Sequence, residues 1–328
     1  MRAEKLSDTM MRFLLPFFLT ADILMGGAEV INMAPYGVET QPYMKIRILD
    51  QRSLTYSDID GHHFFGVSDA AYDAKNKRLY LVTDQKGKLF VFHAVFGSKI
   101  ETFKPLHAFE LRGKGGKAFR RWRRDSEGMT IDDKGKLLIS FEGRAKIGHF
   151  DTRGRMLRAY RLPPKLLNVK NFRSRNKSLE SVALHPEYGV LTASEYPLKR
   201  NPKRSQTIYS LSGREWHFKA EKAANSAVVA IEVMDDGNLL VLERAYSGLR
   251  HPVVITLKKL WLKRCRKKGK SRGSCKSEVL AQFSSSDGWH IDNFEGLAKV
   301  GKNRYVIVSD DNDNFFQRTL LVYFEALS

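Results

Sequence analysis

The segment Asn293-Phe294-Glu295-Gly296-Leu297-Ala298 is followed, after a short turn, by Val306-Ile307-Val308-Ser309-Asp310-Asp311-Asn312. An acidic residue opens this unit, and a hydrophobic strand that ends on further acids closes it. Two earlier parts of the chain repeat the pattern. Ser126–Thr130 leads to Leu138–Glu142, and Leu179–Ala183 leads to Val190–Glu195. Self-similarity of this kind indicates a repeat architecture.

Two weaker copies complete the series. Phe65–Asp69 leads to Leu79–Asp84, and Val228–Ile231 leads to Leu239–Glu243. The acids that close the five units recur at intervals of 48 to 67 residues, at Asp84, Glu142, Glu195, Glu243 and Asp310. Blades of four strands plus loops repeat every ~40–50 residues before insertions. We therefore expect an all-β chain folded as a β-propeller; ordinary β-meanders in two domains are the alternative.

The two ends of the chain carry strand patterns that close the ring. Lys45–Leu49 alternates polar and apolar residues, and so does part of Thr319–Phe324. Pairing these strands in one blade removes an exposed sheet edge. The five visible units leave room for one less regular blade, so the sequence predicts a six-bladed propeller over residues 44–328, closed by N- and C-terminal strands.

Charge is abundant and clustered. The 328 residues include 56 Lys and Arg against 36 Asp and Glu, a formal net charge of +20. Dense basic runs occur at Arg112–Arg124, at Lys199–Arg204 and in a predicted insertion near residues 258–277. Such runs attract phosphates, nucleic acid or anionic head groups.

The N-terminus reads as an export signal. Met11-Arg12 precedes the short apolar run Phe13–Ala21, and Gly26–Ala28 supplies small residues for cleavage, which is typical of a secretory signal peptide at residues 1–28, with Met11 as a second candidate start. Residues 29–43 are then a linker. We expect a periplasmic or secreted protein with no membrane span after processing. Export, and basic runs with few aromatic residues, argue against nucleic acid as the partner.

Cys265 and Cys275 are the only cysteines, and both lie in the basic insertion. In an oxidising compartment they would form a disulfide that closes a small loop. Two free thiols are the alternative.

Several of these strings resemble those of the phytase-like domain family, also described as having esterase-like activity of phytase. They are Asp125–Gly128, Ser178–Ser181, Leu240–Arg244, Asn293–Gly296 and Ser309–Asn312. The resemblance covers roughly residues 60 to 325. It implies a propeller fold and an exported protein, whereas the function must be argued from the site.

The acids that open the units define a candidate metal site. Glu127, Glu180 and Glu295 hold equivalent repeat positions, and a closed ring would bring them together at one end of its channel. Carboxylates that converge repel one another unless a cation neutralises them, and calcium prefers oxygen ligands. Caps on backbone amides are the alternative role. The candidate metal ligands are Asp69, Glu127, Glu180, Glu295, Asp310 and Asp311.

Three arginines are candidates for anion binding: Arg124, Arg144 and Arg244. A guanidinium matches a phosphate, although salt bridges from Arg144 to Glu142 and from Arg244 to Glu243 are the alternative. Two functions stay open, and no catalytic residue is assigned. One is a calcium-dependent phosphoesterase or esterase that uses metal-activated water on an anionic envelope substrate. The other is a non-catalytic propeller that binds an anionic envelope component or a protein partner.

Overall fold

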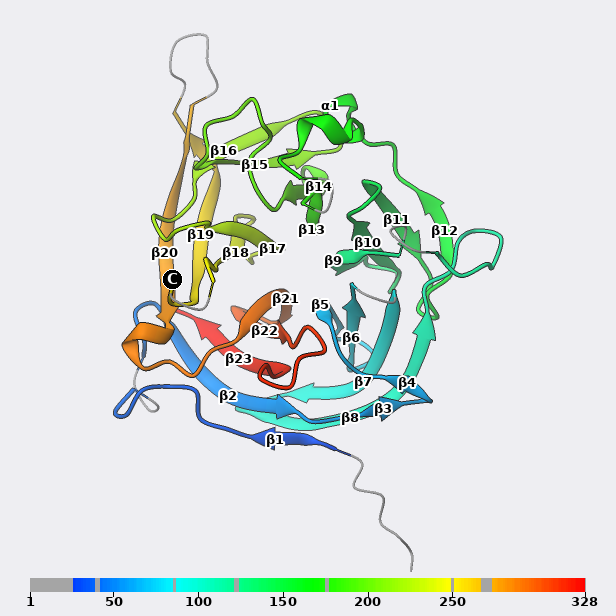
Figure 1. Ribbon diagram of the computed structural model, residues 1–328, viewed down its shortest axis with the longest axis vertical. Helices are drawn as coiled ribbons and strands as arrows, with labels where there is room; N and C mark the ends of the chain where they lie inside the picture. Colours follow the sequence, from blue (N-terminus) through cyan, green and yellow to red (C-terminus); the bar gives the residue numbers. More distant parts are fainter. Residues whose placement is uncertain are drawn as a thin grey trace, which may run out of the picture.

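Five antiparallel sheets surround a central axis in the computed structural model (Figure 1). The structure describes residues 26–38, 42–84, 87–120, 124–174, 177–248, 251–266 and 273–327. The fold is therefore a β-propeller, as expected, but it has five blades and the prediction of six was wrong. The segments near Lys45–Leu49 and Thr319–Phe324 lie in the same sheet as the last repeat, so they supply no separate blade.

Four blades have four strands each. In each of these blades the chain begins at the innermost strand and runs outward strand by strand. The first comprises β5 (Val67–Asp73), β6 (Arg78–Thr83), β7 (Lys88–Phe96) and β8 (Ile100–Glu110). The second comprises β9 (Ser126–Ile131), β10 (Leu137–Phe141), β11 (Lys146–Phe150) and β12 (Met156–Ala159). The third comprises β13 (Leu179–His185), β14 (Gly189–Ser194), β15 (Ser205–Ser210) and β16 (Glu215–Lys219). The fourth comprises β17 (Ala227–Val233), β18 (Leu239–Ala245), β19 (Val254–Cys265) and β20 (Cys275–Ser284).

The fifth blade combines both ends of the described chain. Its strands, from the axis outward, are β21 (Asn293–Gly301), β22 (Arg304–Asp310), β23 (Leu320–Ala326), β2 (Ile46–Leu54) and β1 (Ala28–Val30). β2 pairs antiparallel with β23, with Ile46 opposite Ala326. β1, the first strand of the chain, lies at the outer edge of this blade. The strand that pairs with the C-terminal strand β23 is therefore β2. Sequence alternation predicted the β2–β23 neighbours but gave no signal for β1.

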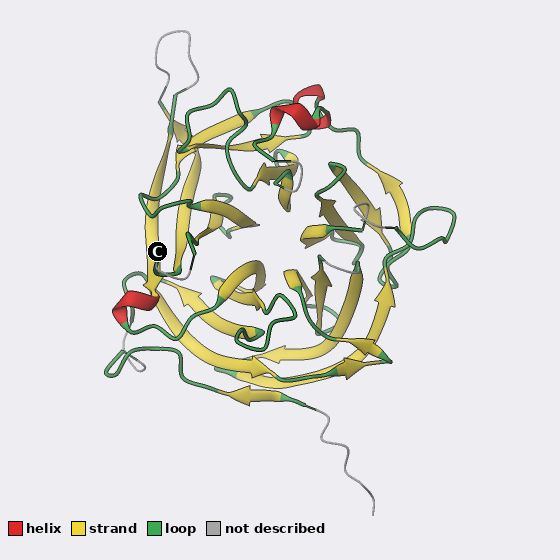
Figure 2. Ribbon diagram, in the orientation of Figure 1, coloured by secondary structure: helices red, strands yellow, loops and turns green. Residues whose placement is uncertain are grey.

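Helices are short and few among the described residues, and loops and turns connect the strands (Figure 2). A small hairpin pairs β3 (Asp58–Ile59) with β4 (His62–His63). The helical segments are α1 (Pro164–Leu167), η2 (Val169–Asn171) and η3 (Ser285–Asp287). No helix among the described residues is long and apolar enough to cross a membrane.

The predicted linker, residues 29–43, packs on the propeller where it is described. Glu29 and Val30 belong to β1, and Met33 and Ala34 are buried in the core. The Met33 amide also donates to Oε1 of Gln51 at 3.0 Å. Residues 29–30 are therefore part of the fifth blade, and Met33 and Ala34 pack in the core beside it. The predicted signal peptide lies almost entirely outside the described residues.

The second strand of each blade is hydrophobic because both of its faces are buried. In β6, Leu79 and Leu81 pack toward the fifth blade, whereas Tyr80 and Val82 pack toward the second. Successive strand residues point to opposite faces, so a strand between two neighbouring blades needs an uninterrupted apolar run. This requirement explains the runs that reveal the repeat in the sequence.

Glycine after the opening acid allows the innermost strands of neighbouring blades to approach closely. A Cβ atom on Gly128 would lie 2.5 Å from the Cα atom of Ser181 in the next blade. A Cβ atom on Gly296 would lie 2.8 Å from the Cα atom of Asp69. The Glu-Gly pairs of the sequence thus combine a charged side chain with the small residue that the crowded axis requires.

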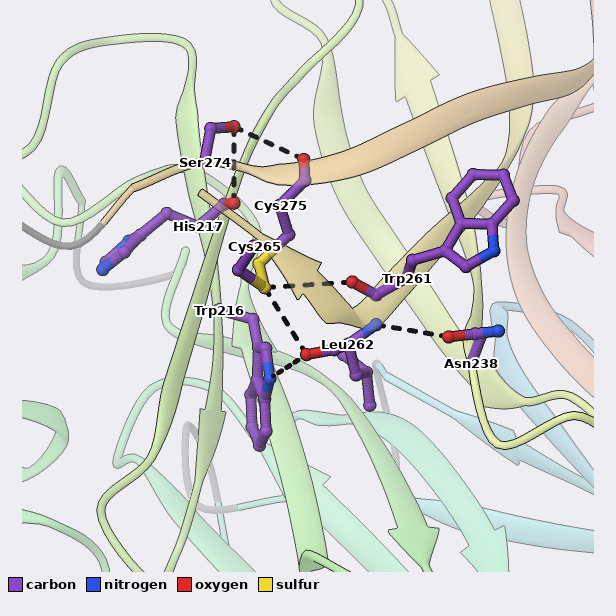
Figure 3. Close-up of a disulfide and its surroundings, with 8 residues drawn as sticks. All are labelled: Trp216, His217, Asn238, Trp261, Leu262, Cys265, Ser274 and Cys275. Carbon is purple, nitrogen blue, oxygen red and sulfur yellow. Dashed lines mark hydrogen bonds between the residues drawn. A yellow bond between two sulfur atoms is a disulfide. The ribbon is translucent and has the colours of Figure 1, made fainter. Parts of the chain in front are cut away.

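The basic insertion is the extended hairpin of β19 and β20, and a disulfide joins Cys265 and Cys275 across it (Figure 3). The run does not form one exposed basic surface. Lys258 is only 1% exposed, and its Nζ atom contacts Glu243 Oε1 at 2.7 Å and Glu221 Oε1 at 2.9 Å. Part of the basic sequence therefore pairs with acids of the fourth blade.

We predict that Gly128→Ala lowers the free energy of unfolding by about 1–3 kcal/mol, because the added methyl group overpacks the axis. Gly115→Ala is the matched control, since Gly115 is exposed and a Cβ atom there meets nothing within 4 Å. Urea unfolding of the two variants measures the difference. Equal stability of both variants would contradict the close packing.

Candidate metal centre

A β-bulge occurs at the same place in the innermost strand of every blade. The bulged residues are Ser68, Glu127, Glu180, Val229 and Glu295. An extra residue in one strand re-aims its side chain, and bulges are frequent next to functional sites. The equivalence of Glu127, Glu180 and Glu295 that the sequence predicted is thus a shared backbone irregularity.

The second strand of each blade contributes one more residue at the level of the bulge. The residue before the bulge pairs with a residue of the second strand, and the contributing residue is the next one along the chain. These residues are Asp84, Glu142, Glu195, Arg244 and Asp310. The sequence spacing placed Glu243 in this series, which was wrong. Glu243 pairs with Val228 and is equivalent to Ser309, so its side chain points to the other face of the strand.

Carboxylates from the second and third blades meet in two overlapping groups. Asp125, Glu127 and Glu142 offer oxygens that all lie within 4.8 Å of one another, and so do Glu142, Glu180 and Glu195. Glu142 belongs to both groups. Of these five acids, which we call the carboxylate cluster, the sequence identified Glu127 and Glu180 as ligands. It missed Asp125, Glu142 and Glu195, although the recurrence of closing acids was the signal that could have found the last two.

Two positively charged side chains lie next to the carboxylate cluster. Arg244 contacts Glu195 through Nη2 at 3.4 Å and Glu295 through Nη1 at 2.5 Å. Lys177 contacts the two Glu195 carboxylate oxygens at 2.7 and 2.9 Å. Arg244 therefore pairs with these channel acids, and the expected salt bridge to Glu243 was wrong because Lys258 holds that residue.

Glu295 belongs to neither carboxylate group, and Arg244 pairs it with Glu195. Besides Arg244, its Oε1 atom accepts a hydrogen bond from Nδ2 of Asn293 at 2.9 Å. Burial raises the pKa of Glu295, and the Arg244 guanidinium opposes this shift. Glu295 thus has its own positive partner and does not need a metal ion.

Burial and like charge raise the pKa values of Glu127, Glu142 and Glu180. Burial is the main cause of the rise in the pKa of Glu142 to about 8, and the charges of Glu195 and Asp125 add to it. Burial, followed by the charge of Glu142, raises the pKa values of Glu127 and Glu180 well above the ordinary range. Glu142 and Glu180 share a hydrogen bond, so one of them carries a proton when no cation is bound.

Oε2 of Glu180 has no hydrogen-bond partner among the described residues, although it is buried. An unpaired buried polar atom is costly and calls for an explanation. A cation between Glu180 and its neighbours would satisfy this oxygen and remove the repulsion. The donor set consists of carboxylate oxygens, which suit calcium or magnesium rather than a metal that prefers nitrogen or sulfur.

Asp69 and Asp311, both predicted as metal ligands, make structural contacts instead. Asp69 accepts backbone hydrogen bonds from Ala70, Met129 and Leu297, at 2.6 to 2.8 Å, and thereby ties three blades together. Asp311 accepts from the Gly66 amide at 2.9 Å and from Thr319 Oγ1 at 2.9 Å. Their oxygens are used in this way, so we leave both residues out of the proposed ligand set.

Asp310 does lie at the ring. Its Oδ1 atom accepts from the Asn312 amide at 2.7 Å, and burial, with the charge of Glu295, raises its pKa to about 9. It is not a member of the carboxylate cluster. It is the acid that the second strand of the fifth blade contributes at this level.

The other two candidate anion-binding arginines differ in position. Arg124 is partly buried, and its charge lowers the pKa of Asp125 against the larger, opposite effect of burial. Arg144 is exposed in the turn between β10 and β11. Arg124 therefore acts on the carboxylate cluster through Asp125, and Arg144 follows the cluster member Glu142 by two residues.

The chain belongs to the phytase-like family, since the family model described as "Esterase-like activity of phytase" matches residues 62–313. Comparison with curated proteins gives no match. Similar solved structures include a streptogramin B lyase, with 8% identity, a TM-score of 0.39, and coverage of 86% of this chain and 99% of that one. A virginiamycin B lyase from Staphylococcus aureus has 11% identity, a TM-score of 0.36, and coverage of 88% and 96%. These scores are too low to carry an argument about function.

We predict that calcium raises the melting temperature of the protein and that Glu142→Gln removes most of this rise. A cation that binds only the folded state stabilises it by about 2.7 kcal/mol at a hundredfold excess over its dissociation constant. Glu142 is shared by both carboxylate groups. Glu295→Gln is the control and should keep most of the rise, because Arg244 and Asn293 already hold that side chain. A wild-type melting curve unmoved by calcium would refute the site.

Without metal, we predict that the free energy of unfolding falls as the pH rises from about 5 to about 9. The pKa of Glu142 rises from its ordinary 4.5 to about 8, and that of Asp310 from 3.8 to about 9. In this window the folded state holds more protons than the unfolded state, so folding weakens as protons leave. Urea titrations in chelator at several pH values measure this. Glu142→Gln should show a shallower decline, and a decline of wild-type steepness in that variant counts against the assignment.

Proposed function

We propose that this phytase-like propeller is a calcium-dependent phosphoesterase that acts on an anionic substrate. The observation that carries the proposal is the pair of overlapping carboxylate groups that share Glu142, together with the unpartnered buried oxygen of Glu180. Asp125, Glu127, Glu142, Glu180 and Glu195 would hold the cation.

When bound, a divalent cation would polarise a phosphoryl oxygen and lower the pKa of water. The protein's own part is to hold the carboxylates: Glu127 and Glu180 lie at bulges, and Glu142 and Glu195 directly follow the second strands β10 and β14. Arg244 and Lys177 pair with the Glu195 carboxylate and orient it at one side of the carboxylate cluster. Glu142 and Glu180, which share a proton when the cluster has no cation, are placed to release or accept one.

A cationic pocket next to the ring supports an anionic substrate. Lys177 lines a cavity of about 540 Å³ together with Tyr196, Lys203, Arg204 and Lys222. Lys177 also contacts Glu195, so it connects this pocket to the carboxylate cluster. A substrate phosphate held by these side chains would lie beside the acids that bind the cation.

The alternative function is a non-catalytic propeller that binds an anionic envelope component or a protein partner. The observation in its favour is that Arg244 and Lys177 neutralise Glu195 and Glu295 without any metal. The ring is then a structural network, and the cationic pocket alone would carry the binding.

We also propose that the protein is exported to the periplasm or secreted. The signal-like N-terminus and the Cys265–Cys275 disulfide support this, because disulfides persist in oxidising compartments. Intact-mass measurement of protein recovered from the periplasm or medium tests it, since retention of residues 12–25 would contradict cleavage near Ala28.

The test of the enzyme is phosphatase activity on p-nitrophenyl phosphate, with metal analysis of the same preparation. We expect activity with calcium, loss of activity in chelator, and recovery when excess calcium is restored. Glu142→Gln should lose at least about tenfold in activity at limiting calcium, which corresponds to about 1.4 kcal/mol of binding. Glu29→Gln, on the exposed strand β1, is the control and should match wild type.

Two results would separate the alternatives. Calcium bound at the channel with no turnover of phosphate esters would favour the binding propeller. Activity that survives chelation and the Glu142→Gln substitution would contradict the proposed centre.

A further inference from the structure

A second cationic depression lies toward the rim of the propeller and shares Arg204 with the cationic pocket beside the ring. Its volume is about 1310 Å³, and strand β16, the loop after β14 and the β19–β20 hairpin form its walls. We call it the rim groove. Its charged lining residues are Lys165, Arg200, Arg204, Glu215, Lys219 and Arg266.

Most of the positive charge in the rim groove is available to a ligand. The single carboxylate of this lining, Glu215, is engaged by Lys165 and lies 3.6 Å from His217. Arg204 uses Nη2 to donate to the Ala220 carbonyl at 2.7 Å. Arg200 and Lys219 are exposed, and neither forms an ion pair within the described parts of the chain.

The wall formed by the hairpin is held in place by several links to β16 (Figure 3). The Cys265–Cys275 disulfide joins its two strands, and Ser274 bridges to His217. Trp216 Nε1 donates to the Leu262 carbonyl at 3.0 Å. A wall fixed before binding lowers the entropy lost when a ligand enters.

The size and chemistry of the groove indicate an extended ligand with several negative groups. Sites for drug-sized molecules occupy roughly 300–1,000 Å³, and this groove is larger. Its cations stand on different walls, so one small anion would meet only some of them. Arginine forks match phosphate oxygens.

The groove favours a phosphate chain over nucleic acid. Among its described lining residues the only Phe, Tyr or Trp is Phe218, which is 1% exposed. Single-stranded nucleic acids gain much of their binding energy by stacking bases on exposed rings. We propose that the rim groove binds a linear polymer that carries consecutive phosphate groups, independently of the chemistry in the channel.

The test is the affinity of fluorescently labelled linear polyphosphate, measured by anisotropy in chelator so that metal in the channel makes no contribution. We expect Arg200→Ser combined with Lys219→Ser to weaken binding at least about tenfold and to reduce the salt dependence of binding. The matched control is Lys104→Ser combined with Lys134→Ser, which removes two exposed lysines from other blades and should bind as wild type does. Melting curves establish that both double variants are folded.

Each remaining outcome decides against the proposal. Equal weakening by the control pair would mean that total charge, and not the rim groove, attracts the polymer. Tighter binding of an oligothymidylate with the same number of phosphates would identify nucleic acid as the ligand. Binding only to vesicles of anionic phospholipid would identify a membrane surface instead.

Discussion

Repulsion between carboxylates buried near the axis is the constraint on which the rest of this structure depends. The bulged residues of the innermost strands and the residues at the same level in the second strands form a ring. Acids occupy most positions of this ring. Such groups cannot all be ionised in a buried site without a positive partner. The protein provides that partner at one side, through Arg244 and Lys177, whereas Glu142 and Glu180 form no ion pair with any cation in the described part of the chain.

The same crowding explains the backbone around the axis. Bulges turn the glutamates inward, and a small residue follows four of the five bulges, so that neighbouring strands can approach, whereas Asp69 follows the fifth. Asp69, at one of these positions, uses its carboxylate to join three blades. The acids are thus divided between those that hold the ring together and those that create negative potential inside it. The net charge of +20 is carried elsewhere, in part by the pocket beside the ring and by the rim groove.

The sequence predicted the propeller because buried second strands require apolar runs that recur with the blades. It did not predict the number of blades, since strand pairing between distant segments decides whether the ends form a blade of their own. The equivalence of Glu127, Glu180 and Glu295 was readable because the Glu-Gly pairs and their spacing are local. The sequence did not predict that Arg244 occupies a position where the other blades have an acid. Glu243 directly precedes Arg244, and an acid at that place fits the repeat pattern of the sequence. Contacts such as those of Asp69 with Met129 and Leu297 depend on the closed ring and have no local signal.

The most direct test of the central claim is a crystal structure of the calcium-soaked protein, with anomalous scattering to locate the ion. The account predicts a peak about 2.3–2.6 Å from carboxylate oxygens of Glu142 and Glu180. Arg244 should remain on Glu195 and Glu295. A channel without the ion at saturating calcium, or an ion bound at Glu295 with Arg244 displaced, would contradict it.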